Sequence, residues 1–288
     1  MNIKTLTLGE RGFPERLANI PSPPKQIYHM GADLGELLDR PCVTIVGTRS
    51  ISAYGRQVTV DLAERLAEQG IVIVSGLAFG VDFQAHQSAL DVNGLAIAVL
   101  PTPLENVVPH NNRDLAEEIL EGGGALISEY PEGTKPAKQN FIARNRLMAG
   151  LGDAVVITEA GEKSGSIYTA NFAHDQGRTV LAIPGDITNL GSIGTNNLIK
   201  ASKAGIMTSY KDVLFALGFY ERKPSARRIK GRNANEQAVI DLLLKGISNG
   251  DELLERSELS ASSFNQAITM LELGGKIRPL GGNQWAPY

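Results

Sequence analysis

The sequence predicts an α/β fold, a doubly wound and mostly parallel sheet, followed by a small winged-helix-like domain. Between residues 41 and 218, short β-branched runs alternate with stretches that carry helical spacing of apolar residues. The β-branched runs lack the apolar–polar alternation of half-exposed strands. From residue 234 onward the pattern changes to short helices and a terminal hairpin. Strands that alternate with helices are typical of a parallel sheet covered on both faces.

The predicted strands are rich in valine, isoleucine and alanine, the composition of strands that are buried on both faces. They are Val43–Val46, Ile71–Val74, Ala96–Leu100, Ala125–Ile127, Ala154–Thr158 and Thr179–Ile183. The stretches between them favour helices over Gly55–Gln69, Asp82–Leu90, Asn112–Glu121, Phe141–Leu151 and Ile167–Gln176. We expect this Rossmann-like domain to span residues 41–218.

The two segments that flank this domain lack its periodicity. Residues 1–40 contain the proline cluster Pro21–Pro24 and show no sustained period, so we expect an extension packed on the domain or partly in polyproline form. Residues 219–233 contain the basic run Arg222–Arg232 with a proline, and we interpret them as a linker. This linker is either solvated or in contact with DNA.

Residues 234–288 predict three helices and a β-hairpin. The helices are Glu236–Leu244, Asp251–Arg256, and a third that Ser260 caps and that runs through Leu273 to Gly274-Gly275; the strands are Lys276–Leu280 and Gln284–Ala286. Acidic residues outnumber basic ones here, and the third helix has no lysine or arginine. A helix that recognises DNA needs such residues. The pattern therefore favours a protein partner over DNA for this domain.

The overall composition is that of an ordinary globular chain, with 42% hydrophobic and 20% charged residues and a formal net charge of −3. A slightly acidic total argues against nucleic-acid binding by global charge, so any such function needs a local site. The one cysteine, Cys42, lies in an apolar run and is interpreted as a buried hydrophobe. The sequence shows neither a secretory signal nor a membrane span, and we expect a cytoplasmic protein.

Small and polar residues follow three of the predicted strands and make candidate anion sites. In parallel sheets, ligands bind outside the carboxyl ends of the strands. The turns there supply Gly47, Thr48, Arg49 and Ser50 after the first strand, Ser75 and Gly76 after the second, and Lys163, Ser164, Gly165 and Ser166 after the fifth. Backbone N–H groups at a helix N-terminus favour an anion. A row of such turns suits a polyphosphate backbone.

The most basic part of this domain is residues 135–146, which contain Lys135, Lys138, Asn140, Phe141 and Arg144. Lysine and arginine can pair with phosphates, and an aromatic ring can stack on an unpaired base. Phe141 could equally be the first core residue of its helix, and the sequence leaves both interpretations open.

Several other site classes lack their motifs. The sequence has no Gly-x-Gly-x-x-Gly after the first strand, no Gly-Lys-Ser/Thr phosphate loop and no Gly-x-Ser-x-Gly elbow after a predicted strand. Asp82 and His86 share a helix face, but without further ligands this spacing favours an internal hydrogen bond over a metal site. We therefore expect no catalytic residues, no cofactor and no metal.

Together these segments resemble the DNA-processing protein A (DprA/Smf) family over about residues 13–215. The matching segments, in family order, are Ile45–Arg49, Ser75–Ala78, Gly80–Asp82 with His86, Leu126–Tyr130, Asn140-Phe141, Arg144–Arg146, Ala149–Leu151, Glu159-Ala160, Ser164–Ser166, Thr169-Ala170, Pro184-Gly185 and Gly194–Ile199. The resemblance implies an extended Rossmann fold, binding of single-stranded DNA, a homodimer, and loading of the recombinase RecA during natural transformation.

The resemblance also implies roles for particular residues. Arg49 matches a phosphate-binding arginine, and Lys163, Phe141 and either Lys135 or Lys138 match further DNA contacts. The stretch Asn197–Gly218 corresponds to the region of dimerisation and of contact with RecA. Three features depart from the family: Phe79 stands where an arginine is common, Pro101–Pro103 replaces a glycine-containing turn, and the small front domain is absent or reduced to residues 1–40.

The row of candidate anion sites and the family resemblance together lead us to expect a non-catalytic protein that binds single-stranded DNA, and the resemblance implies that it protects this DNA and loads RecA onto it. Two other classes remain open. A nucleotide-processing hydrolase on a related scaffold would favour a Pro-Gly-Gly-x-Gly-Thr loop, which the sequence lacks. A transcription regulator would recognise duplex DNA through residues 234–288. The excess of acidic over basic residues in this segment argues against such a function.

Overall fold

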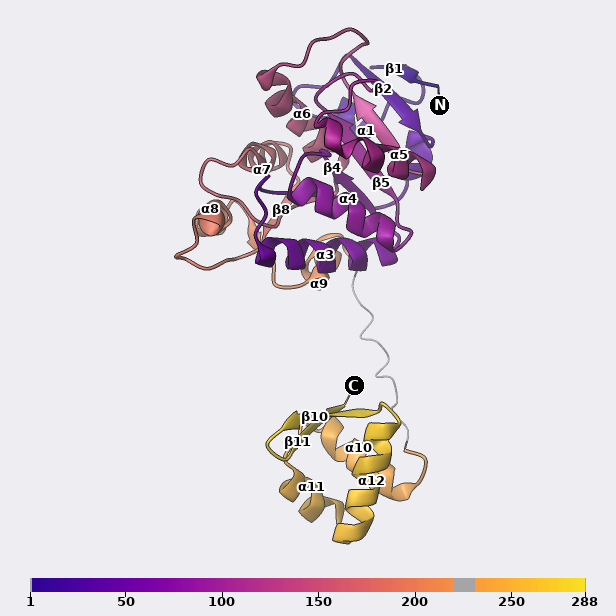
Figure 1. The fold of residues 1–288 in the computed structure, drawn as a ribbon, viewed down its shortest axis with the longest axis vertical. Helices are drawn as coiled ribbons and strands as arrows, with labels where there is room; N and C mark the ends of the chain where they lie inside the picture. The colour runs from indigo at the N-terminus through magenta and orange to yellow at the C-terminus, as the bar shows by residue number, and fades with distance from the viewer. Residues whose placement is uncertain (1, 220–230, 288) are drawn as a thin grey trace. The chain divides into compact units, whose positions relative to one another are not determined.

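The computed structural model describes residues 2–219 and 231–287, which fall into two compact units divided after Tyr220 (Figure 1). Each unit is described by itself. Most of the predicted basic linker, residues 220–230, lies outside the described residues.

The first unit is built on a nine-stranded sheet with the strand order β1-β2-β6-β5-β4-β3-β7-β8-β9. The strands are β1 (Lys4–Thr7), β2 (Gln26–Gly31), β3 (Cys42–Val46), β4 (Val72–Ser75), β5 (Ala96–Leu100), β6 (Ala125–Ser128), β7 (Ala154–Ile157), β8 (Thr179–Ala182) and β9 (Gly205–Ile206). Neighbouring strands from β6 through β9 pair in parallel, whereas β2 pairs antiparallel with both β6 and β1. The six strands that the sequence predicts are confirmed as β3 to β8.

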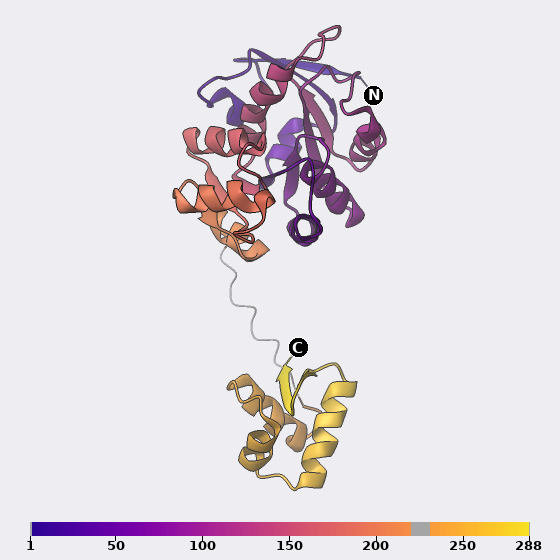
Figure 2. The same ribbon diagram turned by 60° about the vertical axis from the view of Figure 1, so that its left-hand side comes forward.

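Helices cover both faces of this sheet (Figures 1 and 2). They are α1 (Glu15–Ala18), α2 (Leu34–Leu38), α3 (Ala53–Glu68), α4 (Val81–Asp91), α5 (Arg113–Glu121), α6 (Lys138–Leu151), α7 (Ser166–Asp175), α8 (Ile193–Lys200) and α9 (Tyr210–Ala216). Alternate residues of each central strand face opposite cores: Cys42 and Val46 pack with α1, α6 and α7, while Val43 and Ile45 pack with α3, α4 and α9. The doubly wound fold is confirmed.

Residues 1–40 are more than an extension packed on the domain. They contribute β1 and β2, so the sheet is wider than the sequence predicts. In β2 the side chains of Ile27 and His29 are buried and alternate with more exposed neighbours. A strand with only two buried positions, one of them a histidine, carries too little apolar alternation to be recognised beside a proline cluster.

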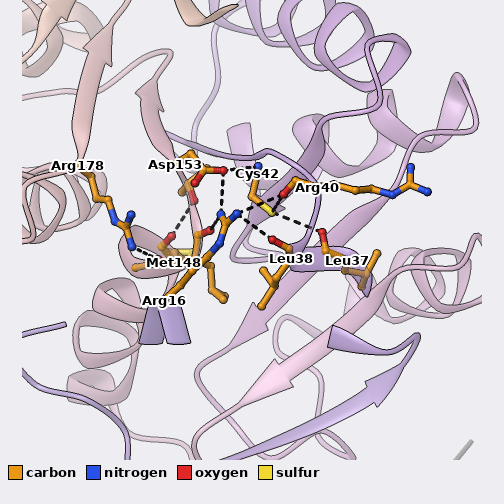
Figure 3. Close-up of polar contacts among 11 residues, drawn as sticks. Arg16, Leu37, Leu38, Arg40, Cys42, Met148, Asp153 and Arg178 are labelled. Atoms are coloured by element: carbon orange, nitrogen blue, oxygen red, sulfur yellow. Dashed lines mark hydrogen bonds and ion pairs between the residues drawn. The ribbon is translucent and has the colours of Figure 1, made fainter. Parts of the chain in front are cut away.

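A group of polar contacts joins these first residues to the amino ends of β3 and β7 (Figure 3). The Arg16 guanidinium lies 2.8 Å from Asp153 Oδ2 and donates hydrogen bonds to the carbonyls of Leu151 at 3.0 Å and Leu38 at 2.9 Å. Asp153 Oδ2 also accepts the backbone N–H of Cys42 at 2.8 Å. One arginine thus connects α1, the segment after α2 and the turn before β7.

The second unit, over residues 231–287, contains α10 (Ala234–Leu244), α11 (Gly250–Ser257), α12 (Ala261–Leu273) and the hairpin of β10 (Ile277–Gly281) and β11 (Gln284–Pro287). The side chains of Asn233, Asn249 and Ser260 cap the three helices by accepting backbone N–H groups. Ile240, Leu243, Leu253, Phe264, Leu271 and Ile277 are among the residues of its core. The predicted three helices and hairpin are confirmed.

We predict that Arg16→Ala lowers the free energy of unfolding of the first unit by about 2 kcal/mol. The substitution leaves the Asp153 carboxylate and two partly buried carbonyls without their donor, and each such loss costs about 1–3 kcal/mol before water compensates. Chemical denaturation followed by circular dichroism measures the effect. Arg113→Ala is the control, because the Arg113–Glu117 pair is 70% and 63% exposed and its loss costs less than about 0.5 kcal/mol. Equal losses for the two variants would contradict the structural role of Arg16.

We also predict that the native Cys42 thiol resists thiol-specific reagents at pH 8. The side chain is buried, and burial raises the pKa of Cys42 to about 12, so the reactive thiolate is scarce at that pH. Absorbance of the released thiol-reagent product is expected to stay near zero for the folded chain and to reach one equivalent in guanidinium. Rapid reaction of the folded chain would show that Cys42 is accessible.

Candidate nucleic-acid interface

A cleft of about 650 Å³ opens at the carboxyl edge of the sheet, where β3 lies between β4 and β7. From β3 the chain proceeds outward through β4, β5 and β6, and α6 then carries it back to β7 on the other side of β3. The loops after β3 and β7 therefore diverge, which is the arrangement that creates a ligand crevice in open parallel sheets. The predicted turns follow the three neighbouring strands β4, β3 and β7.

The loop after β3 is held by both of its neighbours. The Thr48 N–H donates to the Glu159 carbonyl at 2.7 Å, and the Thr48 carbonyl accepts the Val81 N–H at 3.1 Å. A side chain at Gly47 would place its Cβ 2.5 Å from Val81 Cγ2 and 2.7 Å from the Glu159 carbonyl oxygen. Only glycine allows this approach, and the loop it permits directs the exposed Arg49 side chain to the cleft.

Arg49 and Phe141 meet inside the cleft. The Arg49 guanidinium carbon lies 5.3 Å from the centroid of the Phe141 ring, within the range of a cation–π contact. Phe141 comes from the first turn of α6, is half-buried and lines the cleft. The ring is therefore placed where a base can reach it and is not one of the fully buried core residues.

Arg144, which the sequence analysis assigned to DNA contact, lies instead in the floor of the cleft and is 3% exposed. Its guanidinium donates to the Gly76 carbonyl at 2.8 Å and to the Val99 carbonyl. A Cβ at Gly76 would lie 2.5 Å from Arg144 Nη2, so glycine is required to admit the arginine. Burial lowers the pKa of Arg144 to about 10, which leaves it charged at neutral pH, and nearby Asp82 opposes that shift.

Asp82 is the acidic partner in this floor. Burial raises the pKa of its carboxyl, while Arg144 and the backbone N–H groups of Ala78 and Gly76 hold that pKa down. The expected hydrogen bond between Asp82 and His86 is not found, because Asp82 turns to these N–H groups and His86 points into the core. Neither ring nitrogen of His86 has a hydrogen-bond partner among the described residues. Burial lowers the pKa of His86 to about 3, so its ring is neutral.

The turn before α7 forms the opposite wall of the cleft. Ser164 Oγ and Ser166 Oγ share a hydrogen bond of 2.8 Å, and Asn145 Nδ2 donates to the Gly165 carbonyl at 3.2 Å. Lys163 and Gly165 are exposed. The N-terminus of the ten-residue helix α7 and the charge of Lys163 both favour an anion at this wall.

The structure brings ten of the fifteen predicted contact residues together around this cleft: Gly47, Thr48, Arg49, Lys138, Phe141, Arg144, Lys163, Ser164, Gly165 and Ser166. Ser50 lines an adjacent second cleft, and Lys135 is exposed in the loop before α6 without lining either cleft.

The assignment of Ser75, Gly76 and Asn140 to direct contact is corrected. Ser75 is fully buried, and its hydroxyl donates to the Ile45 carbonyl at 2.6 Å inside the sheet. The Gly76 carbonyl faces Arg144, as described above. Asn140 is 8% exposed and does not line the cleft that Phe141 lines. The buried positions of Ser75, Gly76 and Asn140 therefore argue against direct contact with a ligand.

Sequence reasoning missed Asn145, Met148 and Thr169, which line the cleft. Phe141, Asn145 and Met148 lie at helical spacing on one face of α6. That spacing is visible in the sequence and could have extended the predicted site along the helix.

The charge around the cleft differs in sign from that of the whole chain. Arg49, Lys138, Arg144 and Lys163 are cationic, whereas Asp82 is the acidic residue among those that line it. The formal net charge of the chain is −3. The cleft is therefore a local cationic site, lined by an aromatic ring, on an acidic protein. No group of three or more histidine, cysteine or acidic residues placed to hold a metal ion occurs in the described part of the chain.

No helix in residues 2–219 and 231–287 is both long and apolar enough to cross a membrane.

Comparison with known proteins finds two family matches. Residues 4–218 match the DNA recombination-mediator protein A family, and residues 223–283 match the DprA winged helix domain. The chain is 40% identical over 222 residues to protein Smf of Synechocystis, covering 75% of the chain and 54% of that relative. It is 44% identical over 248 residues to protein Smf of Escherichia coli, covering 83% of the chain and 66% of that relative. The chain thus spans about half to two thirds of the length of these relatives.

Two solved structures are similar to the first unit and also cover about three quarters of the chain. DNA processing protein A of Streptococcus pneumoniae has a TM-score of 0.69 and 37% identity, covering 74% of each chain. The Helicobacter pylori protein, whose structure is described as showing its single-stranded DNA binding mode, has a TM-score of 0.67 and 35% identity, covering 75% of this chain and 95% of that one. The family match over residues 4–218, joined to these relatives, shows that the chain belongs to the DNA recombination-mediator protein A (DprA/Smf) family, with a DprA winged helix domain as its second unit.

Proposed function

We propose that the chain binds single-stranded DNA in the cleft at the carboxyl ends of β3 and β7, as a mediator and not as a catalyst. The observation that carries this proposal is the position of the Arg49 guanidinium over the Phe141 ring, in a cleft with Lys138 and Lys163 on its walls. A nucleic-acid strand needs both kinds of group, cations for its phosphates and an aromatic face for its bases.

In this proposal some residues of the cleft bind the phosphates of the strand and Phe141 binds a base. Arg49 and Lys163 pair with phosphates, and the N-terminus of α7 adds its dipole beside Lys163. Lys138, in the first turn of α6, adds a third cation beside Phe141. Phe141 stacks on a base. Lys135 contacts the backbone beyond the cleft. The buried Arg144 supports the cleft from below and does not pair with a phosphate, because carbonyls accept its hydrogen bonds and Asp82 offsets part of its charge.

The cleft favours single strands over duplexes for a steric reason. Phe141 lies inside a concavity of about 650 Å³ and reaches a base only when that base is unstacked from its neighbours. In a duplex both faces of a base are covered, and extruding it costs a few kcal/mol. The single-stranded DNA binding described for the Helicobacter pylori relative supports the same choice.

We further propose that the chain forms a homodimer and delivers the bound strand to RecA, as in natural transformation. The family description as a recombination mediator supports this role. The region Asn197–Gly218 contains β9, which among the described residues pairs with β8 and with no other strand, so that it forms an edge of the sheet there. Ile206 in β9 is 55% exposed. An open edge with an exposed apolar side chain is a surface that a second chain can cover.

The winged helix domain is proposed to contact protein and not DNA. Its third helix, α12, contains no lysine or arginine, and residues at the end of that helix such as Leu273 are exposed. A transcription regulator is the competing function for this unit, and specific duplex binding by residues 231–288 would favour it. A nucleotide hydrolase is the competing function for the first unit, and turnover of nucleoside monophosphates would favour it.

We predict that Arg49→Ala weakens binding of a single-stranded oligonucleotide about tenfold at fixed salt, because a charge-assisted phosphate contact is lost. The slope of the logarithm of affinity against the logarithm of salt concentration is expected to fall by about 0.7, the value for one phosphate contact on a single strand. Fluorescence anisotropy measures both quantities. Arg113→Ala, an exposed arginine on α5 outside the cleft, is the matched control. An unchanged affinity and slope for Arg49→Ala would remove the cleft as the binding site, and equal affinity for duplex would contradict the single-strand preference.

A second prediction concerns the edge strand β9. Ile206→Arg is expected to shift the mass measured by light scattering from two chains to one, since a charge on an edge blocks pairing. The same variant is expected to bind single-stranded DNA but to lose the slower gel band that wild type forms with DNA and RecA together. A wild-type mass of one chain, or an unchanged band with RecA, would contradict the dimer or the RecA proposal respectively.

A further inference from the structure

A second cleft of about 540 Å³ lies beside the first, on the other side of the loop that follows β3. Arg49 lines both clefts, so they adjoin at this residue. The second cleft is lined by Arg49, Ser50, Ile51, Arg56, Phe79, Gly80, Phe83 and Asn112. None of these lining residues is acidic, and two of them are aromatic. The same pairing of cations with an aromatic face that characterises the first cleft is thus present again.

Phe79 is the aromatic side chain that this cleft presents to solvent. Its side chain is 47% exposed, unlike that of Phe83, which packs against a buried core. An exposed phenylalanine carries an apolar ring into water without the compensation of burial. The ring therefore remains available to a partner with an apolar face.

The position of Phe79 relative to Arg49 is set by the next residue. Gly80 has a φ of +78°, and a Cβ there would lie 2.3 Å from the Thr48 carbonyl oxygen and 2.7 Å from the Arg49 carbonyl. The Val81 N–H donates to the Thr48 carbonyl at 3.1 Å. The loop after β4 therefore rests directly on the loop after β3, and it holds Phe79 beside the residue that joins the two clefts.

Arg56 in the second cleft has no ion-pair partner in the described part of the chain, whereas Arg49 interacts electrostatically with the buried Asp82. Arg56 on α3 donates to the neutral Gln84 Oε1 of α4 at 2.6 Å, and Arg49 contacts the Phe141 ring. Gln84 orients Arg56 without neutralising it. The guanidinium charge of Arg56 thus has no ion-pair partner, and a phosphate can pair with it at a smaller desolvation cost than that of breaking an ion pair.

We propose that the second cleft binds a further nucleotide of the same single strand, with Phe79 stacked on its base and Arg56 paired with its phosphate. The proposal rests on the proposed function of the first cleft, because Arg49 is the point at which the strand passes from one cleft to the other. In this proposal the bound strand crosses the loop after β3, with one part on the side of α6 and α7 and the next part on the side of α3 and α4. Phe79 then contributes through stacking, and Arg56 through charge.

The test compares thymidine oligonucleotides of increasing length by fluorescence anisotropy. Wild-type affinity is expected to rise at the length at which the strand reaches the second cleft, and Phe79→Ala is expected to lose about tenfold in affinity from that length onward, within the range for one stacked base. Shorter oligonucleotides are expected to bind Phe79→Ala as they bind wild type. The salt slope is expected to stay unchanged, since stacking releases no counterions.

Three further variants make the result specific. Phe79→Trp is expected to retain the affinity for long strands, and Arg56→Ala is expected to lower their salt slope by about 0.7. Phe219→Ala is the matched control, because Phe219 is also 47% exposed and lies in a cleft with Arg16 and Asp153 at the opposite edge of the sheet.

A single 2-aminopurine base moved along the strand reports stacking by its quenched fluorescence at one position, and Phe79→Ala is expected to remove that quenching.

The outcomes separate this proposal from the function on which it rests. If Arg49→Ala weakens binding while Phe79→Ala binds long strands as tightly as wild type, the second cleft is overturned and the first stands. If Phe79→Ala weakens short and long strands equally, Phe79 acts through the first cleft and the second is again overturned. If wild type binds no single-stranded DNA, both proposals fall together.

Discussion

The approach of three loops at the carboxyl edge of the sheet is the constraint on which the site depends. The loop after β3 contacts the loop after β7 through Thr48 and Glu159, and it contacts the start of α4 through Val81. Gly47 and Gly80 are the two positions at which a Cβ would separate these loops, by contacts of 2.5 Å and 2.3 Å. The direction of Arg49, and with it the shape of both clefts, therefore follows from backbone packing and not from the arginine itself.

The site also depends on a buried polar layer beneath the cleft. Arg144 is held by carbonyls of β5 and of the β4 loop, and Asp82 by N–H groups of that same loop. Burying two ionisable groups is costly, and their proximity and hydrogen bonds offset part of that cost. Because Arg144 and Asp82 carry opposite charges, the local positive charge of the cleft comes from Arg49, Lys138 and Lys163 above the layer, on a chain of net charge −3.

The sequence predicts the central sheet and the winged helix well, because long apolar runs and glycine punctuation carry those patterns directly. It does not predict β1 and β2, whose few buried residues give no clear period. For the site, the turns could be located from their place after the strands, but the orientation within each turn could not. Ser75 and Arg144 both look like exposed phosphate ligands in the sequence, and only the packing of the β4 loop against α6 shows that they point inward. The contact between Arg49 and Phe141 joins residues far apart in the chain and leaves no local signal.

The contact between Arg49 and Phe141 also covers the ring on which the proposed function stacks a base. The Arg49 guanidinium occupies the ring of Phe141, to which the proposed function assigns a base, so an entering strand must exchange one partner of the ring for another. The exchange costs about 0.5–1 kcal/mol, the worth of an exposed cation–π contact, and it frees the arginine at the moment a phosphate arrives. In the proposed function, recognition of the base and recognition of the phosphate are therefore coupled, because Phe141 and Arg49 both become available when the contact between them opens.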